Sequence, residues 1–142
     1  MSQIYRGVFV VTYSGQCLCG AIRYELSGEP KAVALCHCND CRRSAGAPMV
    51  AWAMFPETAL TLIQGQPKTI NSSGTAMRSF CVDCGSGLFY RNAAVLPGIV
   101  DVQSATLDYP EALVPTVQIQ TAERLAWMKH VHELPEIERF PT

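Results

Sequence analysis

Seven cysteines, arranged as two separate pairs and one triplet, constrain this chain more than any other feature of its sequence. The triplet lies in the stretch C-H-C-N-D-C, which places Cys36, Cys38 and Cys41 within six residues. Thiols this close give strained disulfides, and one of three is always left over, so a disulfide framework does not suit the stretch. Three thiolates can instead converge on one soft, tetrahedral cation such as zinc and leave its fourth position open.

The other four cysteines form two short knuckles far apart in the sequence. The first has the pattern G-x-C-x-C-G over residues 15–20, and the second has the pattern C-x-x-C-G over residues 81–85. A glycine after each knuckle suits a backbone that curls around the sulfurs with a positive φ. Four protein ligands are typical of structural zinc, whereas three ligands and an open position are typical of catalytic zinc. The pattern therefore predicts two zinc ions per chain, a structural ion on Cys17, Cys19, Cys81 and Cys84 and a catalytic ion on Cys36, Cys38 and Cys41.

Other roles compete with these assignments. The four outer cysteines could pack as small buried hydrophobic residues, and the triplet could be a redox-active cluster of exposed thiols with low pKa values. His37 alternates with two proposed ligands, so in an extended segment its side chain points away from them, either behind the site or at the surface. His130 and His132 are expected to be solvated, and Trp52 and Trp127 are expected to form core or pocket walls.

Composition limits the class of protein. The 142 residues fit one domain over 1–142, and 49% hydrophobic against 16% charged residues predicts a compact globule. A net charge of -1 argues against a nucleic-acid binder. No stretch has the length of a membrane span. The odd cysteine count, and an apolar patch at residues 7–11 without a cleavage pattern, favour a cytoplasmic protein in a reducing setting.

The pattern of apolar residues predicts a mainly β fold of short antiparallel strands. Alternation of apolar and polar residues predicts strands at residues 22–26, 58–62 and 117–120. Further strands are expected at residues 7–11, 32–35, 49–55, 77–80, 88–90 and 99–102, separated by turns rich in Gly, Pro, Asn and Ser. Helix is expected only in a turn after Cys41 and at residues 122–128, and the tail from Leu134 is expected to be irregular.

The cysteine motifs and their surroundings resemble the family of glutathione-dependent formaldehyde-activating enzymes, which includes domains related to centromere protein V. The resemblance rests on G-x-C-x-C-G, C-H-C-x-x-C-R and F-C-x-x-C-G in this order, together with residues 46–48, the turn at Gly65, and residues 88–90 and 105–108. It extends over about residues 13–135. It implies a GFA domain with a β-tent fold and zinc-binding cysteine knuckles, structural zinc on the two outer pairs and catalytic zinc on the triplet.

One segment departs from the family pattern. Where many relatives carry a histidine, an isoleucine and an aromatic residue, this chain has Gln118, Ile119 and Gln120. If this segment lines the pocket, we expect a substrate preference that differs from that of the named enzyme.

The resemblance implies a carbon–sulfur lyase similar to S-(hydroxymethyl)glutathione synthase, which forms or cleaves an S-hydroxymethyl adduct of glutathione and formaldehyde. Zinc on three thiolates has a net charge of about -1 and is poorly suited to activating water, but it can take up a thiol as its thiolate. Arg42 or Arg43 is expected to balance part of the negative charge. This reasoning favours a small-molecule thiol and an aldehyde as partners, without choosing glutathione among thiols, and it is compatible with a homodimer.

Two alternatives to the enzyme remain at this point. In the first, both metals are structural and the β surface is a protein-binding module without catalytic activity, as the centromere-related domains suggest. In the second, the chain is a nucleic-acid-binding zinc ribbon, which the near-neutral charge disfavours.

Overall fold

In the computed structural model, which describes residues 2–5 and 8–140, the chain folds into two β-sheets, so the mainly β prediction is confirmed. The four-stranded sheet has the order β1 (Ser2–Tyr5), β2 (Val8–Gln16), β3 (Arg23–Ser27) and β6 (Leu60–Gln64). The seven-stranded sheet has the order β11 (Val117–Ile119), β4 (Ala32–Cys36), β5 (Val50–Pro56), β10 (Ile99–Gln103), β9 (Gly87–Arg91), β8 (Ala76–Phe80) and β7 (Lys68–Ser73).

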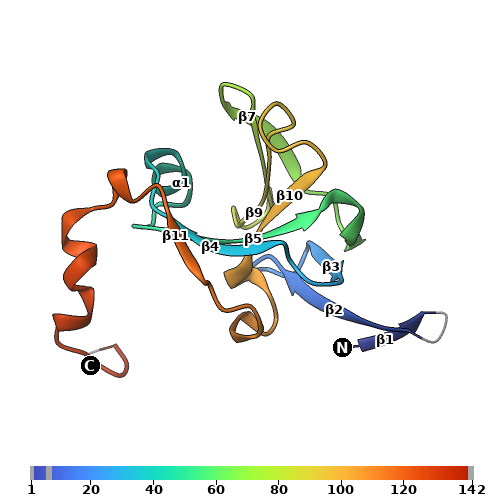
Figure 1. The fold of residues 1–142 in the computed structure, drawn as a ribbon, viewed down its shortest axis with the longest axis horizontal. Coiled ribbons are helices and arrows are strands. Elements are labelled where there is room, and N and C mark those ends of the chain that lie inside the picture. Colours follow the sequence, from blue (N-terminus) through green and yellow to red (C-terminus); the bar gives the residue numbers. More distant parts are fainter. Residues whose placement is uncertain (1, 6–7, 141–142) are drawn as a thin grey trace.

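Neighbouring strands pair in antiparallel fashion, with one exception. Strand β11 pairs in parallel with β4, in a register that places Ile119 opposite Cys36. The pair joins the edge of the longer sheet to a segment from near the end of the chain, which runs beside β4 in Figure 1. Because β11 covers this edge, the strand that ends in Cys36 has a partner on both sides.

The core lies where side chains from the two sheets meet. Tyr24 and Leu26 of β3 pack in one apolar cluster with Phe55 of β5, Phe89 of β9 and Val100 of β10. The ring of Tyr24 lies edge-on to that of Phe89, with 5.2 Å between ring centroids. Burial of several large side chains supplies the main favourable term in folding. This cluster also contains Cys17 and Cys81, so the core holds one sulfur of each cysteine knuckle.

The helical content is small. Helix α1 (Asn39–Ala45) begins at the Cys38 cap, before Cys41, and ends at Gly46, whose φ of 62° a residue without Cβ adopts easily. The remaining helical pieces are 3-10 turns at Glu57–Ala59, Ser104–Thr106, Pro110–Ala112, Thr121–Glu123 and Ala126–Glu133. The last two replace the helix expected at residues 122–128.

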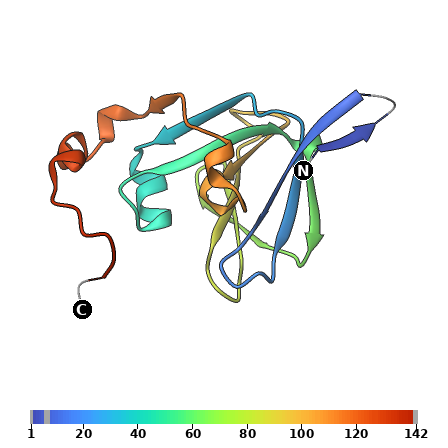
Figure 2. The same ribbon diagram turned by 90° about the horizontal axis from the view of Figure 1, so that it is seen from below.

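Two segments project from the body of the molecule at opposite ends (Figure 1). One is the β1–β2 hairpin, in which the strand expected from residue 7 begins at Val8, while Gly7 lies outside the described residues. The other is the C-terminal segment from Gln120, which extends away from both sheets in Figure 2 as well. Trp127 lies in this segment with 55% of its surface exposed, so the expectation that it forms a core or pocket wall is wrong. The tail from Leu134 is irregular, as expected.

The other expected strands agree with the structure to within one or two residues, and two strands, β1 and β7, were not expected. Strand β7 lies next to β8, and all six of its residues are exposed, so it shows no alternation between core and solvent. It extends the long sheet beyond β8 and places Ser72 beside Arg78, which matters for the site below.

Candidate metal centres

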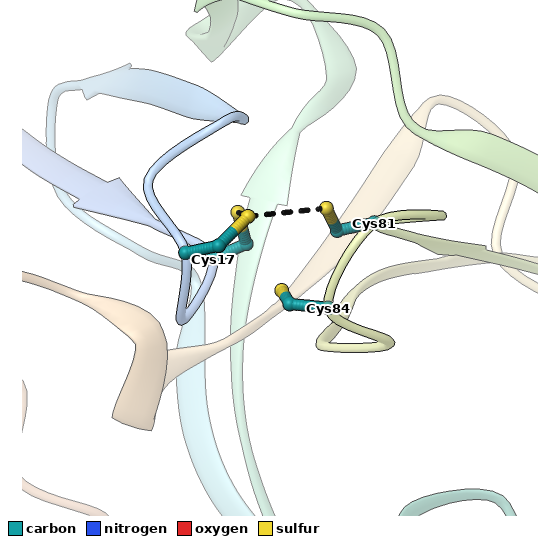
Figure 3. Close-up of side chains that lie close together, drawn as sticks. Cys17, Cys81 and Cys84 are labelled. Carbon is teal, nitrogen blue, oxygen red and sulfur yellow. Dashed lines mark hydrogen bonds between the residues drawn. The ribbon is translucent and has the colours of Figure 1, made fainter.

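The two outer knuckles meet at a single point. Cys17 and Cys19 follow β2, while Cys81 and Cys84 lie between β8 and β9. Their sulfurs lie within 4.8 Å of one another, including 3.7 Å from Cys17 to Cys19 and 3.8 Å from Cys19 to Cys81. Figure 3 shows Cys17, Cys81 and Cys84 with their sulfurs turned toward one another.

These separations fit a tetrahedral metal. Four sulfurs at about 2.3 Å from one zinc ion stand about 3.8 Å apart at the edges of the tetrahedron. The donor set is also the one that zinc prefers in closed sites. The four-cysteine cluster, Cys17, Cys19, Cys81 and Cys84, could therefore hold a metal ion.

Local backbone geometry aims these sulfurs. Gly20 and Gly85 each follow a knuckle with φ of 80° and 79°, as the glycine pattern in the sequence predicts. The turns that they close bring the Ile22 N–H to within 3.3 Å of the Cys17 sulfur. In the second knuckle the Ser86 hydroxyl lies 3.2 Å from the Cys84 sulfur, and this contact lowers the pKa of Cys84 to about 5. Donors that face a sulfur favour its thiolate form, which is the form that binds metal.

The triplet converges at the junction of β4 and α1. Cys36 ends β4, Cys38 caps the start of α1, and Cys41 lies within the helix. The Cys41 N–H donates to the Cys38 sulfur over 3.2 Å, so the cap itself turns the chain and brings the thiols together. Their sulfurs also lie within 4.8 Å of one another. This three-cysteine cluster, Cys36, Cys38 and Cys41, could hold a metal ion with one position left for a ligand.

A cavity of about 220 Å³ opens onto the three-cysteine cluster. Its walls include Trp52, Tyr90 and Asp101 from the long sheet, together with Ile119 and Gln120 from the C-terminal side. The prediction that Trp52 forms a pocket wall is confirmed. Of the segment 118–120, Ile119 and Gln120 line the pocket. Only 5% of Cys36 and 6% of Cys41 is exposed to solvent. This burial disfavours a redox cluster of exposed thiols.

The cation beside the three-cysteine cluster is Arg78. Its Nη2 donates to the Cys41 sulfur over 3.6 Å, whereas Arg42 donates instead to the Asn39 side chain. The hydrogen bond from Cys36, and after it the one from Arg78, lowers the pKa of Cys41 to about 5 although burial opposes this. The pKa of Cys36 is raised by the same pairing with Cys41. The guanidinium of Arg78 therefore favours the thiolate form of Cys41.

A buried carboxyl group shares the cavity. Asp101 of β10 is 9% exposed, and burial, with a smaller effect from the charge of Cys41, raises its pKa to about 6. A carboxyl group kept close to neutrality near pH 6 can both accept and donate a proton. The only other carboxyl group in the cavity wall among the described residues is Asp40, whose Oδ2 accepts a hydrogen bond from Ser73.

The sequence analysis did not predict that Arg78, Tyr90 and Asp101 line the site. Strand register brings them together, because Arg78 stands opposite Tyr90, and Tyr90 stands opposite Asp101. The residues lie on strands that were expected, but the pairing that aligns them joins positions far apart in the sequence. The available signal was a charged residue, Arg78 or Asp101, within each of two short strands.

His37 makes a contact that was not expected. The ring is 1% exposed, so the surface alternative is wrong, and its Nε2 donates to Gln118 Oε1 of β11 over 2.8 Å. The ring contributes to neither of the two cysteine clusters. His130 and His132 are exposed on the C-terminal segment, as expected, and His130 Nδ1 lies 3.2 Å from a carboxylate oxygen of Glu133. In the described part of the chain, no helix is long and apolar enough to cross a membrane.

Known proteins resemble this chain in sequence and in fold. Over 78 residues it is 32% identical to an uncharacterized lyase of Schizosaccharomyces pombe, an overlap of 55% of this chain and 56% of that protein. The chain thus spans little more than half the length of this relative. A crystal structure of a Rhodobacter sphaeroides protein has the same fold, with a TM-score of 0.59, 24% identity, and coverage of 74% of this chain and 98% of the other. Residues 12–123 match the family of glutathione-dependent formaldehyde-activating enzymes, and this chain belongs to that family.

Proposed function

We propose that the protein is a zinc-dependent carbon–sulfur lyase that forms or cleaves the S-hydroxymethyl adduct of a glutathione-like thiol and a small aldehyde such as formaldehyde. The observation that carries the proposal is the convergence of three sulfurs, from Cys36, Cys38 and Cys41, on one wall of a cavity. A scaffold has no need of an incomplete ligand set beside a cavity, whereas a catalytic centre needs both.

The two clusters would divide the roles. Cys17, Cys19, Cys81 and Cys84 would hold a structural zinc ion that ties β2 to the β8–β9 turn. Cys36, Cys38 and Cys41 would hold the catalytic ion, which supplies a position where a thiol binds as its thiolate. We assign both centres to a single domain over 1–142, and we place the protein in the cytoplasm, where such thiols stay reduced.

The balance of the reaction is simple. The thiol sulfur forms a bond to the carbonyl carbon, the electron pair of the C=O bond moves to oxygen, and this oxygen gains the proton that the thiol has lost. Asp101, which lines the cavity, would hold that proton between the two events. A volume of about 220 Å³ accommodates formaldehyde and the sulfur end of a thiol, which fits a small aldehyde better than a bulky one.

The walls of the cavity would orient these two reactants. Trp52 and Tyr90 lie with 5.9 Å between ring centroids, and they would exclude water from one side of the cysteine sulfurs. Exclusion of water favours addition of sulfur to the aldehyde over hydration of the aldehyde.

Metal content and aldehyde turnover test the proposal together. The wild-type chain is expected to bind two zinc ions and to accelerate exchange between formaldehyde and its glutathione adduct above the uncatalysed rate, as followed by NMR with ¹³C-formaldehyde. Cys38→Ser is expected to lose one zinc ion and the acceleration. Leu18→Ala serves as the matched control, because this side chain lies inside a cysteine knuckle but is 84% exposed. Full acceleration by Cys38→Ser with the second zinc ion absent would refute the catalytic assignment.

One observation favours a second function, that of a protein-binding module. The C-terminal segment exposes Trp127, Leu134, Ile137 and Phe140, a larger apolar surface than a solvated tail needs. In that case both metals would be structural. Two zinc ions that ignore added thiols, in a protein that does not accelerate adduct exchange, would support the module and exclude the lyase.

A further inference from the structure

Arg78 is a buried cation whose surroundings contain sulfur and aromatic rings. Only 9% of the residue is exposed. Its Nη2 donates to the Cys41 sulfur over 3.6 Å, and its Nε donates to the Ser72 hydroxyl over 3.1 Å. The guanidinium carbon lies 4.9 Å from the ring centre of Tyr90 and 6.0 Å from that of Trp52.

A buried arginine is normally paired with a carboxylate, because an uncompensated charge is costly to bury. Among the described residues, no ion pair involves Arg78. Asp40 and Asp101 line the same cavity, yet neither is within ion-pair distance of this guanidinium. The negative partner that the structure offers is therefore the three-cysteine cluster itself.

The charge of that cluster explains why such a partner is needed. Three thiolates around a divalent ion carry a net charge of about -1, and a fourth thiolate from the substrate raises this to about -2. Each added negative charge in a cavity of low polarity is costly unless a cation stands nearby. Arg78 is fixed in place by Ser72 and by the two rings, so it needs no rearrangement when the fourth sulfur arrives.

We propose that Arg78 is a positioning residue for the thiol substrate: it holds the Cys41 sulfur and supplies the fixed positive charge that lets a fourth, anionic sulfur enter the cavity. The proton of the entering thiol leaves for the solvent or for the carboxyl group in the cavity. This inference rests on the proposed function, because it concerns the thiol that the three-cysteine cluster would bind.

Arg78 could instead bind a carboxylate of the substrate, and the experiment must distinguish this role from stabilisation of the entering sulfur. Arg78 and Trp52 also line a neighbouring cavity of about 460 Å³ with several serine hydroxyls in its wall. An arginine there could recognise a carboxylate of the substrate, as arginines commonly do. A charge beside the sulfurs affects every thiol, whereas a carboxylate contact affects only thiols that carry a carboxylate.

The experiment compares two thiols on the full chain loaded with Co²⁺ in place of zinc. Glutathione carries carboxylates and 2-mercaptoethanol carries none, and binding of either to the three-cysteine cluster changes the sulfur-to-cobalt absorption bands. We expect R78Q to weaken binding of both thiols by a similar factor, about 10–100-fold, which is the usual effect of removing a group that supports metal ligands. R78K, which keeps the charge but loses the planar fork, is expected to recover part of this loss.

Arg91 provides the matched control. It lies on the adjacent strand β9 and makes its ion pair with Glu57, with 2.8 Å between Nη2 and Oε1, away from the cysteines. R91Q is expected to bind both thiols as the wild type does. If R78Q does not fold, as judged by its thermal transition, R78K carries the comparison, with an expected intermediate loss for both thiols.

Two results would overturn the proposal. Unchanged affinity for both thiols would show that Arg78 has no role in thiol entry, and loss for glutathione alone would assign it to carboxylate recognition. Failure of the proposed function looks different, because then the wild-type cobalt protein itself would show no spectral change with either thiol.

Discussion

His37 Nε2 lies 2.8 Å from Gln118 Oε1, and this contact joins the end of β4 to β11 across 81 residues of sequence. The backbone N–H of His37 also donates to the carbonyl oxygen of Ile119, over 3.1 Å. Together these bonds fix the short strand β11, whose last residue Ile119 lines the cavity together with the following Gln120. His37 thus acts on the site from behind, by holding one of its walls.

Gln118→Ala should therefore loosen β11. The substitution removes the partner of a buried ring nitrogen, which costs about 1 kcal/mol in unfolding free energy. Chemical denaturation measures this cost, and amide hydrogen exchange at Ile119 should quicken while exchange in β10 stays slow. Gln118→Glu, which keeps an acceptor oxygen in the same place, is the control. Equal exchange at Ile119 in all three proteins would contradict the role of this bond.

The two cysteine clusters should differ in what they contribute. Structural zinc in small folding units supplies on the order of 10–16 kcal/mol, which is comparable to the stability of a whole domain. Cys81→Ser is therefore expected to unfold or aggregate, because Cys81 is 1% exposed and its sulfur lies 3.8 Å from that of Cys19 across the joint between the knuckles. Cys41→Ser is expected to remain folded and to lose turnover.

Circular dichroism and zinc content distinguish these outcomes. A chelator should give the same contrast in the wild type, with one zinc ion removed early without unfolding and the second removed only as the fold is lost. Equal melting temperatures for the wild type and Cys81→Ser would end the structural assignment of the four-cysteine cluster.

Close packing at Gly15 gives a third prediction. A Cβ at position 15 would overlap the ring of Tyr24, which is 1% exposed and whose hydroxyl lies 2.7 Å from that of Thr106. Because the ring has no room to move, Gly15→Ala should destabilise the protein by about 1–3 kcal/mol, measured by urea unfolding. Gly87→Ala is the control, since its Cβ meets only the flexible end of Gln103 at 2.5 Å, and it should cost much less.

Asp101 predicts a dependence of stability on pH. Burial raises its pKa from 3.8 to about 6, so the native state favours the neutral carboxyl and loses stability as pH rises from the unfolded to the folded pKa. A difference of about 2 pKa units corresponds to about 3 kcal/mol. Asp101→Asn, which stays neutral, should therefore stabilise the protein by up to about 3 kcal/mol at pH 8 and by about half of this at pH 5.

Urea unfolding of both proteins at the two pH values checks the prediction. The difference between pH values is the informative quantity, because pH effects from groups that do not interact with Asp101 are common to the wild type and the variant. A gain that is the same at pH 5 and pH 8 would show that the carboxyl is not held in its neutral form.

Local patterns were enough to predict the cysteine clusters and most of the strands. The knuckles at residues 15–20 and 81–85 gather their sulfurs because spacing and a following glycine act within a few residues. Strand β3 alternates buried and half-buried positions, so its period was visible in the sequence. The geometry within each knuckle and within β3 is local, although the meeting of the two knuckles depends on the fold.

Features that depend on a distant partner, or on the lack of one, were not visible. Strand β7 has six exposed residues and no apolar alternation, so only its pairing with β8 marks it as a strand. The large apolar side chain of Trp127 suggests a place in the core, but this residue is exposed on a segment that extends away from the sheets. Arg78 and Asp101 reach the cavity through the register of three paired strands, which no local window contains.

The parallel pairing of β11 with β4 has a consequence for the order in which the nascent chain can assemble. Ribosomal synthesis delivers residue 84, the last of the four-cysteine cluster, well before residues 117–119 of β11. Chains begin to fold from the N-terminal side while they are being made. The four-cysteine cluster can therefore come together first, while the side of the three-cysteine cluster later covered by Ile119 and Gln120 still stands open to solvent.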